Sequence, residues 1–209
     1  YDLDRPLHVF DADKLKGDLT LRGGRPGEEL AALNGKRYAL DESMTVIADQ
    51  SGALSLGGVI GGESSACGEA TTSVFIEAAL FDPVRTAATG RKLQVQSDAR
   101  YRFERGVDPE FTAPGLEVAT RLIIEMCGGT PSKVAIAGAV PEWQRRYHLR
   151  ADRVETLGGV AISAPDQRRI LEDLGCKIAN ESDGFAVEPP SWRADIEGEA
   201  DLVEEILRI

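Results

Sequence analysis

The sequence predicts an α+β protein with two parts, a layered domain of β-sheet and helices followed by a small α+β helical module. Short strand-like segments separated by turn residues occupy residues 18–80. Apolar residues at helical spacing follow, between residues 83 and 127 and again from residue 163 onward. Strands and helices are therefore segregated along the chain rather than alternating, which is typical of α+β folds. Pro141-Glu142-Trp143 marks the boundary between the parts.

The strand-like segments of the first part are bounded by residues that favour turns. Leu19-Thr20-Leu21 alternates in polarity, and Asn34-Gly35 between two apolar stretches is a strong hairpin signal. Residues 44–48 and 53–56 are two further candidate strands. Residues 73–80 are largely apolar, so we expect a buried strand there, and we expect another short strand at 133–136.

Two helices are predicted in the first part. Pro83 suits the first turn of a helix that runs to about Lys92. Residues 114–127 have the clearest helical period, and Gly128-Gly129 ends the pattern. We expect the apolar face of this second helix to pack inward; it comprises Leu116, Ala119, Leu122, Ile123 and Met126.

The second part begins near residue 145 and contains two predicted helices. Ser163-Ala164-Pro165-Asp166 is typical of a capping box, with an acidic residue three positions after the cap. That helix ends at Gly175, and residues 185–187 predict a short strand. A second, acidic amphipathic helix starts at Glu199. The residues expected to point inward from the two helices are Ile170, Leu171, Leu174, Leu202, Val203, Ile206 and Leu207.

Composition limits the class of protein. No run of about 18 apolar residues is present, so no membrane helix is expected. The start of the chain lacks the basic and apolar regions of a signal peptide, and without a Met it is expected to be a fragment or a processed chain. Cys67, Cys127 and Cys176 are scattered and form no CxxC pair, which predicts no metal site and fits a reducing cytoplasm. We expect Cys127 and Cys176 to be small core residues.

Charge argues against a general nucleic-acid binder, because the net charge is −11. Residues 85–105 nevertheless hold six of the 24 basic residues. Such a segment can contact phosphate, or it can be a salt-bridged surface, and composition alone favours the second. The six residues are Arg85, Arg91, Lys92, Arg100, Arg102 and Arg105.

Four features have residue types suited to chemistry or binding, and each has a structural alternative. His8 suits proton transfer, or is a hydrogen-bonded structural histidine. Residues 57–63, GGVIGGE, can expose backbone N–H groups to a ligand, or form a tight turn. Glu77 places a costly carboxylate in an apolar strand, unless it faces outward. Residues 96–109 alternate charged and aromatic residues, which fits either an RNA surface or a salt-bridge network.

Residues 97–109, SDARYRFERGVDP, resemble the hallmark segment of bacterial phenylalanyl-tRNA synthetase beta subunits. Other segments agree with that family in the expected order, and together they span nearly the whole chain. They are PLHVFDAD at 6–13, GGVIGGE at 57–63, FIEAALFDP at 75–83, ATRLIIEMCGG at 119–129, PSWRAD at 190–195 and DLVEEI at 201–206.

The resemblance implies two domains. Residues 1–140 are expected to be the third-and-fourth-domain unit, an editing domain whose N-terminal part precedes Tyr1. Residues 145–209 are expected to be the fifth domain, cut near its C-terminal end. Five positions match the family's editing pocket: His8 beside the scissile ester, Gly61 and the small Ala99 in the pocket, Glu77 as the carboxylate that binds the tyrosine hydroxyl, and Ser97 where relatives often have Thr.

The resemblance also implies a function. The chain would belong to a cytoplasmic phenylalanine-tRNA ligase and hydrolyse mischarged Tyr-tRNA(Phe) after transfer. Its partners would be tRNA(Phe) and the alpha subunit of an α2β2 heterotetramer, with no membrane. No cofactor is expected in this segment, while the complete enzyme would use ATP and Mg²⁺. The alternative is a non-catalytic module that docks tRNA or supports the alpha subunit.

Overall fold

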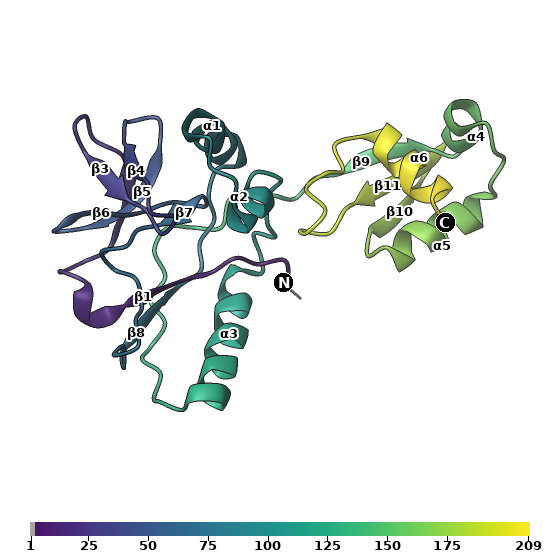
Figure 1. Ribbon diagram of the computed structural model, residues 1–209. Coiled ribbons are helices and arrows are strands. Elements are labelled where there is room, and N and C mark those ends of the chain that lie inside the picture. Colours follow the sequence, from purple (N-terminus) through teal and green to yellow (C-terminus); the bar gives the residue numbers. More distant parts are fainter. Residues whose placement is uncertain (1–2) are drawn as a thin grey trace. The chain divides into compact units, whose positions relative to one another are not determined.

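The computed structural model describes residues 3–209 and confirms the α+β class, with helices and antiparallel sheets in both parts (Figure 1). The chain divides into two compact units, Tyr1–Ala137 and Gly138–Ile209. In the described range no helix is both long and apolar enough to cross a bilayer.

The first unit is built on a four-stranded antiparallel sheet in the order β2-β5-β6-β7. Its strands are β2 (Thr20–Gly23), β5 (Thr45–Asp49), β6 (Gly52–Leu56) and β7 (Ile60–Gly61). A separate hairpin joins β3 (Glu29–Ala31) to β4 (Arg37–Ala39), and the Asn34-Gly35 turn lies between them, as predicted. The core beneath is apolar and includes Leu30, Leu40, Met44, Val46, Leu56 and Val59.

A two-stranded ribbon pairs β1 (His8–Asp11) with β8 (Val74–Glu77), and the short 3-10 turn η1 (Ala12–Lys14) follows β1. The strand at 73–80 is shorter than predicted, and its expected burial was wrong at its start. Val74 and Phe75 are 42% and 41% exposed, because β8 has only one partner strand and its first half is left uncovered. The second half, Ile76 and Glu77, is partly buried.

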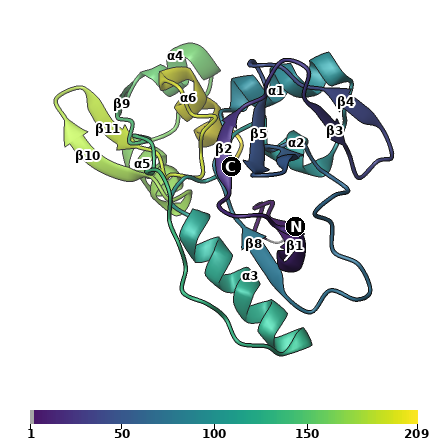
Figure 2. The ribbon, with the colours of Figure 1, turned by 90° about the vertical axis from the view of Figure 1, so that its left-hand side faces the viewer.

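Three helices complete the first unit: α1 (Pro83–Leu93), α2 (Asp98–Phe103) and α3 (Thr112–Cys127). The start of α1 confirms the prediction, since Pro83 occupies its first turn and the Asp82 side chain accepts from the backbone N–H of Arg85. Figure 2 shows α3 beside the β1–β8 ribbon.

The helix α3 forms where predicted, but its apolar face is only partly buried by residues 3–209: Leu116, Ala119 and Ile123 are half-buried, and the other two residues are exposed. Leu122 is 46% exposed and Met126 is 74% exposed, and Cys127 is exposed rather than in the core. The helical spacing of the apolar residues therefore predicted the helix correctly but predicted more burial than its C-terminal half has. The strand predicted at 133–136 was also wrong: residues 128–146 form no helix or strand, and no strand within residues 3–209 pairs with them.

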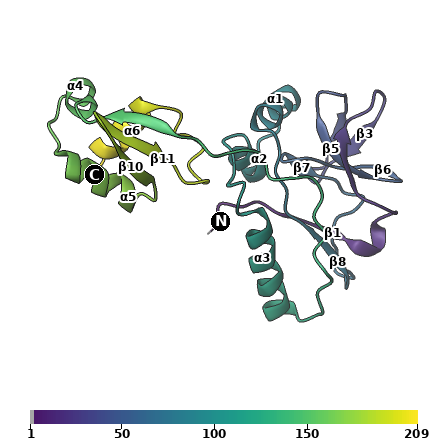
Figure 3. The ribbon, with the colours of Figure 1, turned by 180° about the vertical axis from the view of Figure 1, so that it is seen from behind.

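The second unit is a three-stranded antiparallel sheet in the order β10-β11-β9, with three helices packed against it or against one another (Figure 3). The elements are β9 (Tyr147–Arg150), α4 (Arg153–Gly158), α5 (Ala164–Asp173), β10 (Lys177–Glu181), β11 (Gly184–Glu188) and α6 (Glu199–Leu207). Ser163 caps α5 as predicted, accepting from the N–H of Asp166 and donating to its carboxylate. The core contains Leu171, Cys176, Val187, Ile196, Leu202 and Ile206.

Candidate functional site

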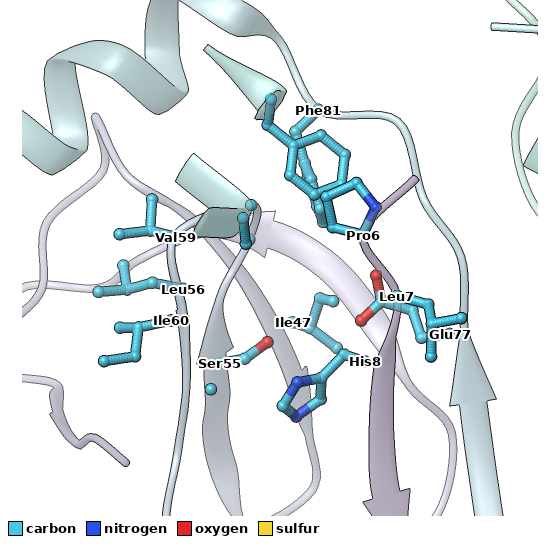
Figure 4. A pocket seen from close by; sticks show the side chains of 15 residues that line it. Pro6, Leu7, His8, Ile47, Ser55, Leu56, Val59, Ile60, Glu77 and Phe81 are labelled. Carbon is cyan, nitrogen blue, oxygen red and sulfur yellow. The ribbon is translucent and has the colours of Figure 1, made fainter. Parts of the chain in front are cut away.

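A small cavity lies between the β1–β8 ribbon and the end of the four-stranded sheet, with a volume of about 60 Å³ (Figure 4). That volume is well below the range of about 300–1,000 Å³ typical of small-molecule sites. Its walls are mostly apolar. They include Pro6, Leu7, Ile47, Leu56, Val59, Ile60, Phe81 and Phe103.

His8 and Glu77 are brought together by strand register. They are directly opposite each other in the antiparallel β1–β8 pair, so their side chains lie on the same face of the ribbon. Both line the cavity, although 69 positions separate them in sequence. The outward orientation considered for Glu77 is thus excluded by the geometry.

Burial changes the charge of both groups. Desolvation raises the pKa of Glu77 from 4.5 to about 7, against the opposing effect of the Arg5 guanidinium. Desolvation also lowers the pKa of the His8 imidazole, which favours its neutral form. The Nε2 atom of His8 is buried and has no hydrogen-bond partner among the described residues. The cavity consequently holds a neutral base beside an acid that titrates near neutral pH.

Gly61 makes room for the His8 ring. A Cβ built at Gly61 would overlap the imidazole Cε1 of His8 and lie 3.0 Å from its Nε2. Gly58 has a φ of +70°, which favours glycine, and its position packs against the rings of Phe81 and Phe103. The GGVIGG segment is therefore a turn at residues 57–59 that leads into β7, close to its structural alternative, and Gly57, Gly58 and Gly61 also form the cavity wall.

Ala99 and Ser97 differ in what they contribute. Ala99 lies in the first turn of α2 and lines the cavity. Ser97 is absent from that lining: its hydroxyl donates to the carbonyl of Val59 at 2.5 Å and accepts from the N–H of Arg100 at 3.1 Å. Four of the five predicted residues thus share one cavity, and the fifth fixes the start of the helix that carries Ala99.

Arg5 was missed by sequence reasoning. Its side chain is buried, and its guanidinium donates to the carbonyls of Asp108 and Ala79 at 2.9 and 2.7 Å and to the hydroxyl of Thr112 at 2.6 Å. These bonds join the segment before β1 to the segment after β8 and to the start of α3. No local pattern reveals such a role, because every partner is more than 70 positions away.

The basic segment 85–105 is mostly engaged within the protein. Arg100 pairs with Glu104, Arg102 with Asp4, and Lys92 with Asp41. Arg105 lies over the Tyr101 ring at 3.7 Å. Of the two interpretations left open for this segment, the structure therefore favours the salt-bridge network.

Comparison with protein families gives two matches that together cover most of the chain. The family described as B3/4 domain matches residues 1–128. The family described as tRNA synthetase B5 domain matches residues 147–209.

Curated relatives match the whole chain. A phenylalanine–tRNA ligase beta subunit from Paramagnetospirillum magneticum is 60% identical over 209 residues, covering 100% of this chain and 26% of the relative. The corresponding subunits from Rhodospirillum rubrum and Bradyrhizobium diazoefficiens are 52% and 51% identical, with the same coverage. The chain thus spans about a quarter of the length of these relatives.

Among solved structures, an N-terminal fragment of the phenylalanyl-tRNA synthetase beta subunit from Pyrococcus horikoshii aligns with a TM-score of 0.45 and 16% identity. The alignment covers 96% of this chain and 58% of that fragment.

Proposed function

The chain belongs to the phenylalanine–tRNA ligase beta-subunit family, and on that premise we propose that its cavity hydrolyses tyrosine wrongly attached to tRNA(Phe). The B3/4 match contains the whole cavity. The observation that carries the proposal is the position of Glu77, a carboxyl group opposite His8 in an otherwise apolar cavity.

The need for such a site follows from the chemistry of the two amino acids. A pocket that binds phenylalanine cannot strongly reject an isostere with one added hydroxyl, and discrimination in a comparable case is only about 100-fold. A second pocket that requires the hydroxyl solves this. Tyrosine would donate its hydroxyl to the Glu77 carboxylate, while phenylalanine would leave that carboxylate desolvated and unpaired. Ala99 leaves room for the ring.

In the proposed reaction a water molecule attacks the carbonyl carbon of the aminoacyl ester. The ester bond to the ribose breaks, and tyrosine and free tRNA(Phe) are released. Neutral His8 orients the attacking water or the end of the tRNA. The backbone beside Gly61 positions the substrate.

Glu77 has a second possible role that the same geometry allows. A carboxyl group with a pKa of about 7 suits a general base at neutral pH. In that case Glu77 would take a proton from the water rather than bind the tyrosine hydroxyl. The two roles predict different effects of replacing Glu77 on the deacylation rates of Tyr-tRNA(Phe) and Phe-tRNA(Phe).

The remaining assignments belong to the same proposal. Residues 1–140 are the editing domain and residues 145–209 the fifth domain, with tRNA(Phe) and an alpha subunit as partners in a cytoplasmic α2β2 enzyme. No Lys or Arg is among the residues that line the cavity, so no side-chain cation there would bind the phosphates of ATP. Within residues 3–209 there is no group of three or more His, Cys, Asp or Glu side chains arranged so that it could hold a metal ion. We assign ATP and Mg²⁺ to the complete enzyme.

The experiment compares deacylation of Tyr-tRNA(Phe) and Phe-tRNA(Phe) by the full-length heterotetramer with Glu77→Ala. If Glu77 binds the hydroxyl, the ratio of the two rates collapses. If it is the general base, both rates fall by a similar factor, about 100-fold or more. Glu63→Ala is the matched control, because Glu63 is exposed and does not line the cavity. Absence of Tyr-tRNA(Phe) deacylation in the wild-type enzyme would refute editing and leave the docking or scaffold function.

A further inference from the structure

A second and larger pocket lies against α2, and the proposed chemistry does not use it. Its volume is about 470 Å³, which falls in the range of about 300–1,000 Å³ typical of small-molecule sites, whereas the cavity holds about 60 Å³. We call it the α2 pocket, because its whole lining comes from α2 and the residues beside it. The lining residues are Gln96, Ser97, Asp98, Arg100, Tyr101 and Glu104.

The helix α2 separates this pocket from the cavity. Ala99 and Phe103 line the cavity, while Ser97, Tyr101 and Glu104 line the α2 pocket. Side chains three or four residues apart share one face of a helix, so the two sets lie on different faces of α2. An α-helix with its side chains is about 10–12 Å wide. The two sites are therefore about one helix width apart.

Tyr101 presents an aromatic ring to the α2 pocket. The residue is 58% exposed, and the Arg105 guanidinium lies over one face of its ring at 3.7 Å from the centroid. Arg105 does not line the pocket, which leaves the other face of the ring for a ligand. Proteins that bind single-stranded nucleic acid stack bases on exposed aromatic rings, with added stabilisation from Arg. Tyr101 is thus suited to stack a nucleobase.

The polar groups of the α2 pocket match the edge of a base rather than a phosphate. The one cation in its lining, Arg100, donates to the Glu104 carboxylate at 2.9 Å and to the Val95 carbonyl at 2.6 Å. The side chains of Gln96 and Asp98 make no hydrogen bond with any residue in the range 3–209. A carboxylate accepts from the exocyclic amino group of cytosine, and an amide can both donate and accept.

We propose, on the premise of the editing function, that the α2 pocket binds a cytosine from the single-stranded end of the tRNA. Every tRNA ends in the sequence CCA, and the amino acid is esterified to the ribose of the terminal adenosine. When that ester is in the cavity, the preceding cytosine is close enough to cross the width of α2. Single-stranded ends are where proteins read RNA bases, by stacking and by hydrogen bonds to base edges.

Each part of the base has a partner in the α2 pocket. The ring of the cytosine stacks on Tyr101. Its amino group donates to the Asp98 carboxylate, and the Gln96 amide donates to its ring nitrogen. A free nucleotide offers similar base chemistry, but its phosphates would lie beside Asp98 and Glu104 with the Arg100 guanidinium already engaged. The pocket therefore suits a base within an RNA strand better than a free nucleotide.

The kinetic test uses Tyr101→Ala in the full-length synthetase. Loss of the stacked base should raise KM for Tyr-tRNA(Phe) deacylation by about 5- to 150-fold and leave kcat nearly unchanged. The slope of log KM against log salt concentration should stay that of the wild type, because no phosphate contact is lost. Tyr101→Phe keeps the ring and should retain most of the affinity. An unchanged KM in Tyr101→Ala, or a loss confined to kcat, overturns the proposal.

The carboxylate is tested in the same assay. Asp98→Ala should also raise KM, because the amino group of the base loses its acceptor. Asp13→Ala is the matched control: Asp13 is an exposed carboxylate in the first turn of η1, and it lines neither site. A KM that rises equally in both variants would show a general effect of charge and overturn the role of Asp98.

A photo-cross-link gives a readout that does not depend on hydrolysis. Uncharged tRNA(Phe) with 5-iodocytidine in place of its last cytosine is irradiated with the full-length synthetase, and the attached peptide is identified by mass spectrometry. We expect a cross-link to Tyr101 that Tyr101→Ala loses. Absence of that cross-link in the wild type overturns the proposal, and its removal by excess ATP would assign the pocket to a free nucleotide instead. If the cross-link forms but the wild type cleaves no Tyr-tRNA(Phe), the editing function fails while the binding site stands.

Discussion

Replacing Glu77 by Gln tests the electrostatics of the cavity directly. Burial raises the pKa of Glu77 from 4.5 to about 7. At 1.36 kcal/mol per pKa unit, ionising this carboxyl group costs the folded state about 3 kcal/mol. The folded protein binds the proton more tightly than the unfolded chain does. The resulting stability is therefore fully present below pH 4.5 and is lost as the pH rises through about 7.

Glu77→Gln keeps the shape of the side chain and removes its titration. Relative to wild type, we expect the variant to gain about 3 kcal/mol in the free energy of local opening between pH 4.5 and 8. The measurement is hydrogen exchange of the β1 and β8 amides in the full-length protein, corrected for the intrinsic pH dependence of exchange. Other titrating groups are common to both proteins and cancel in the difference.

Glu63→Gln is the control, because Glu63 is exposed and does not line the cavity. A flat difference for Glu77→Gln would mean that the carboxyl group is solvated. A difference of opposite slope would mean that the pKa of Glu77 is lowered, with Arg5 outweighing burial. Either result would refute the account of a neutral acid in an apolar cavity.

Three further substitutions test the cavity wall and the start of α2 beside it. Ala99→Trp should abolish Tyr-tRNA(Phe) hydrolysis while aminoacylation continues, because the indole fills the space for the substrate ring; unchanged deacylation would place Ala99 outside the site. Gly61→Ala should displace the His8 ring and lower deacylation by about 100-fold, measured at saturating substrate. Ser97→Ala should cost about 1 kcal/mol of stability through the lost cap of α2, seen in a thermal melt, and leave the Tyr/Phe ratio of deacylation unchanged.

Local chemistry explains which parts of the fold were predictable. The hairpin at Asn34-Gly35, the start of α1 at Pro83 and the cap at Ser163 depend on a few adjacent residues, so the sequence specifies them directly. Glu77 was predictable for a related reason. Burying a carboxyl group within an apolar strand costs free energy, so such a residue is expected at a functional site. Glu77 indeed lines the cavity, where burial raises its pKa.

Features that depend on distant partners could not be predicted. The expected core position of Cys127 and the strand at 133–136 followed from local apolar patterns, and nothing in residues 3–209 covers or pairs with either segment. The role of Arg5 depends on carbonyl groups that only the folded chain brings near it.

The bonds of Arg5 also bear on when the cavity forms during synthesis. They close over sequence separations of 74, 103 and 107 residues, and contacts of that kind form late because long loops lose entropy before they gain contacts. We expect a growing chain to have no complete cavity until Thr112 has emerged from the ribosome. If the cavity hydrolyses mischarged tRNA(Phe) as proposed, a half-made subunit would not yet do so.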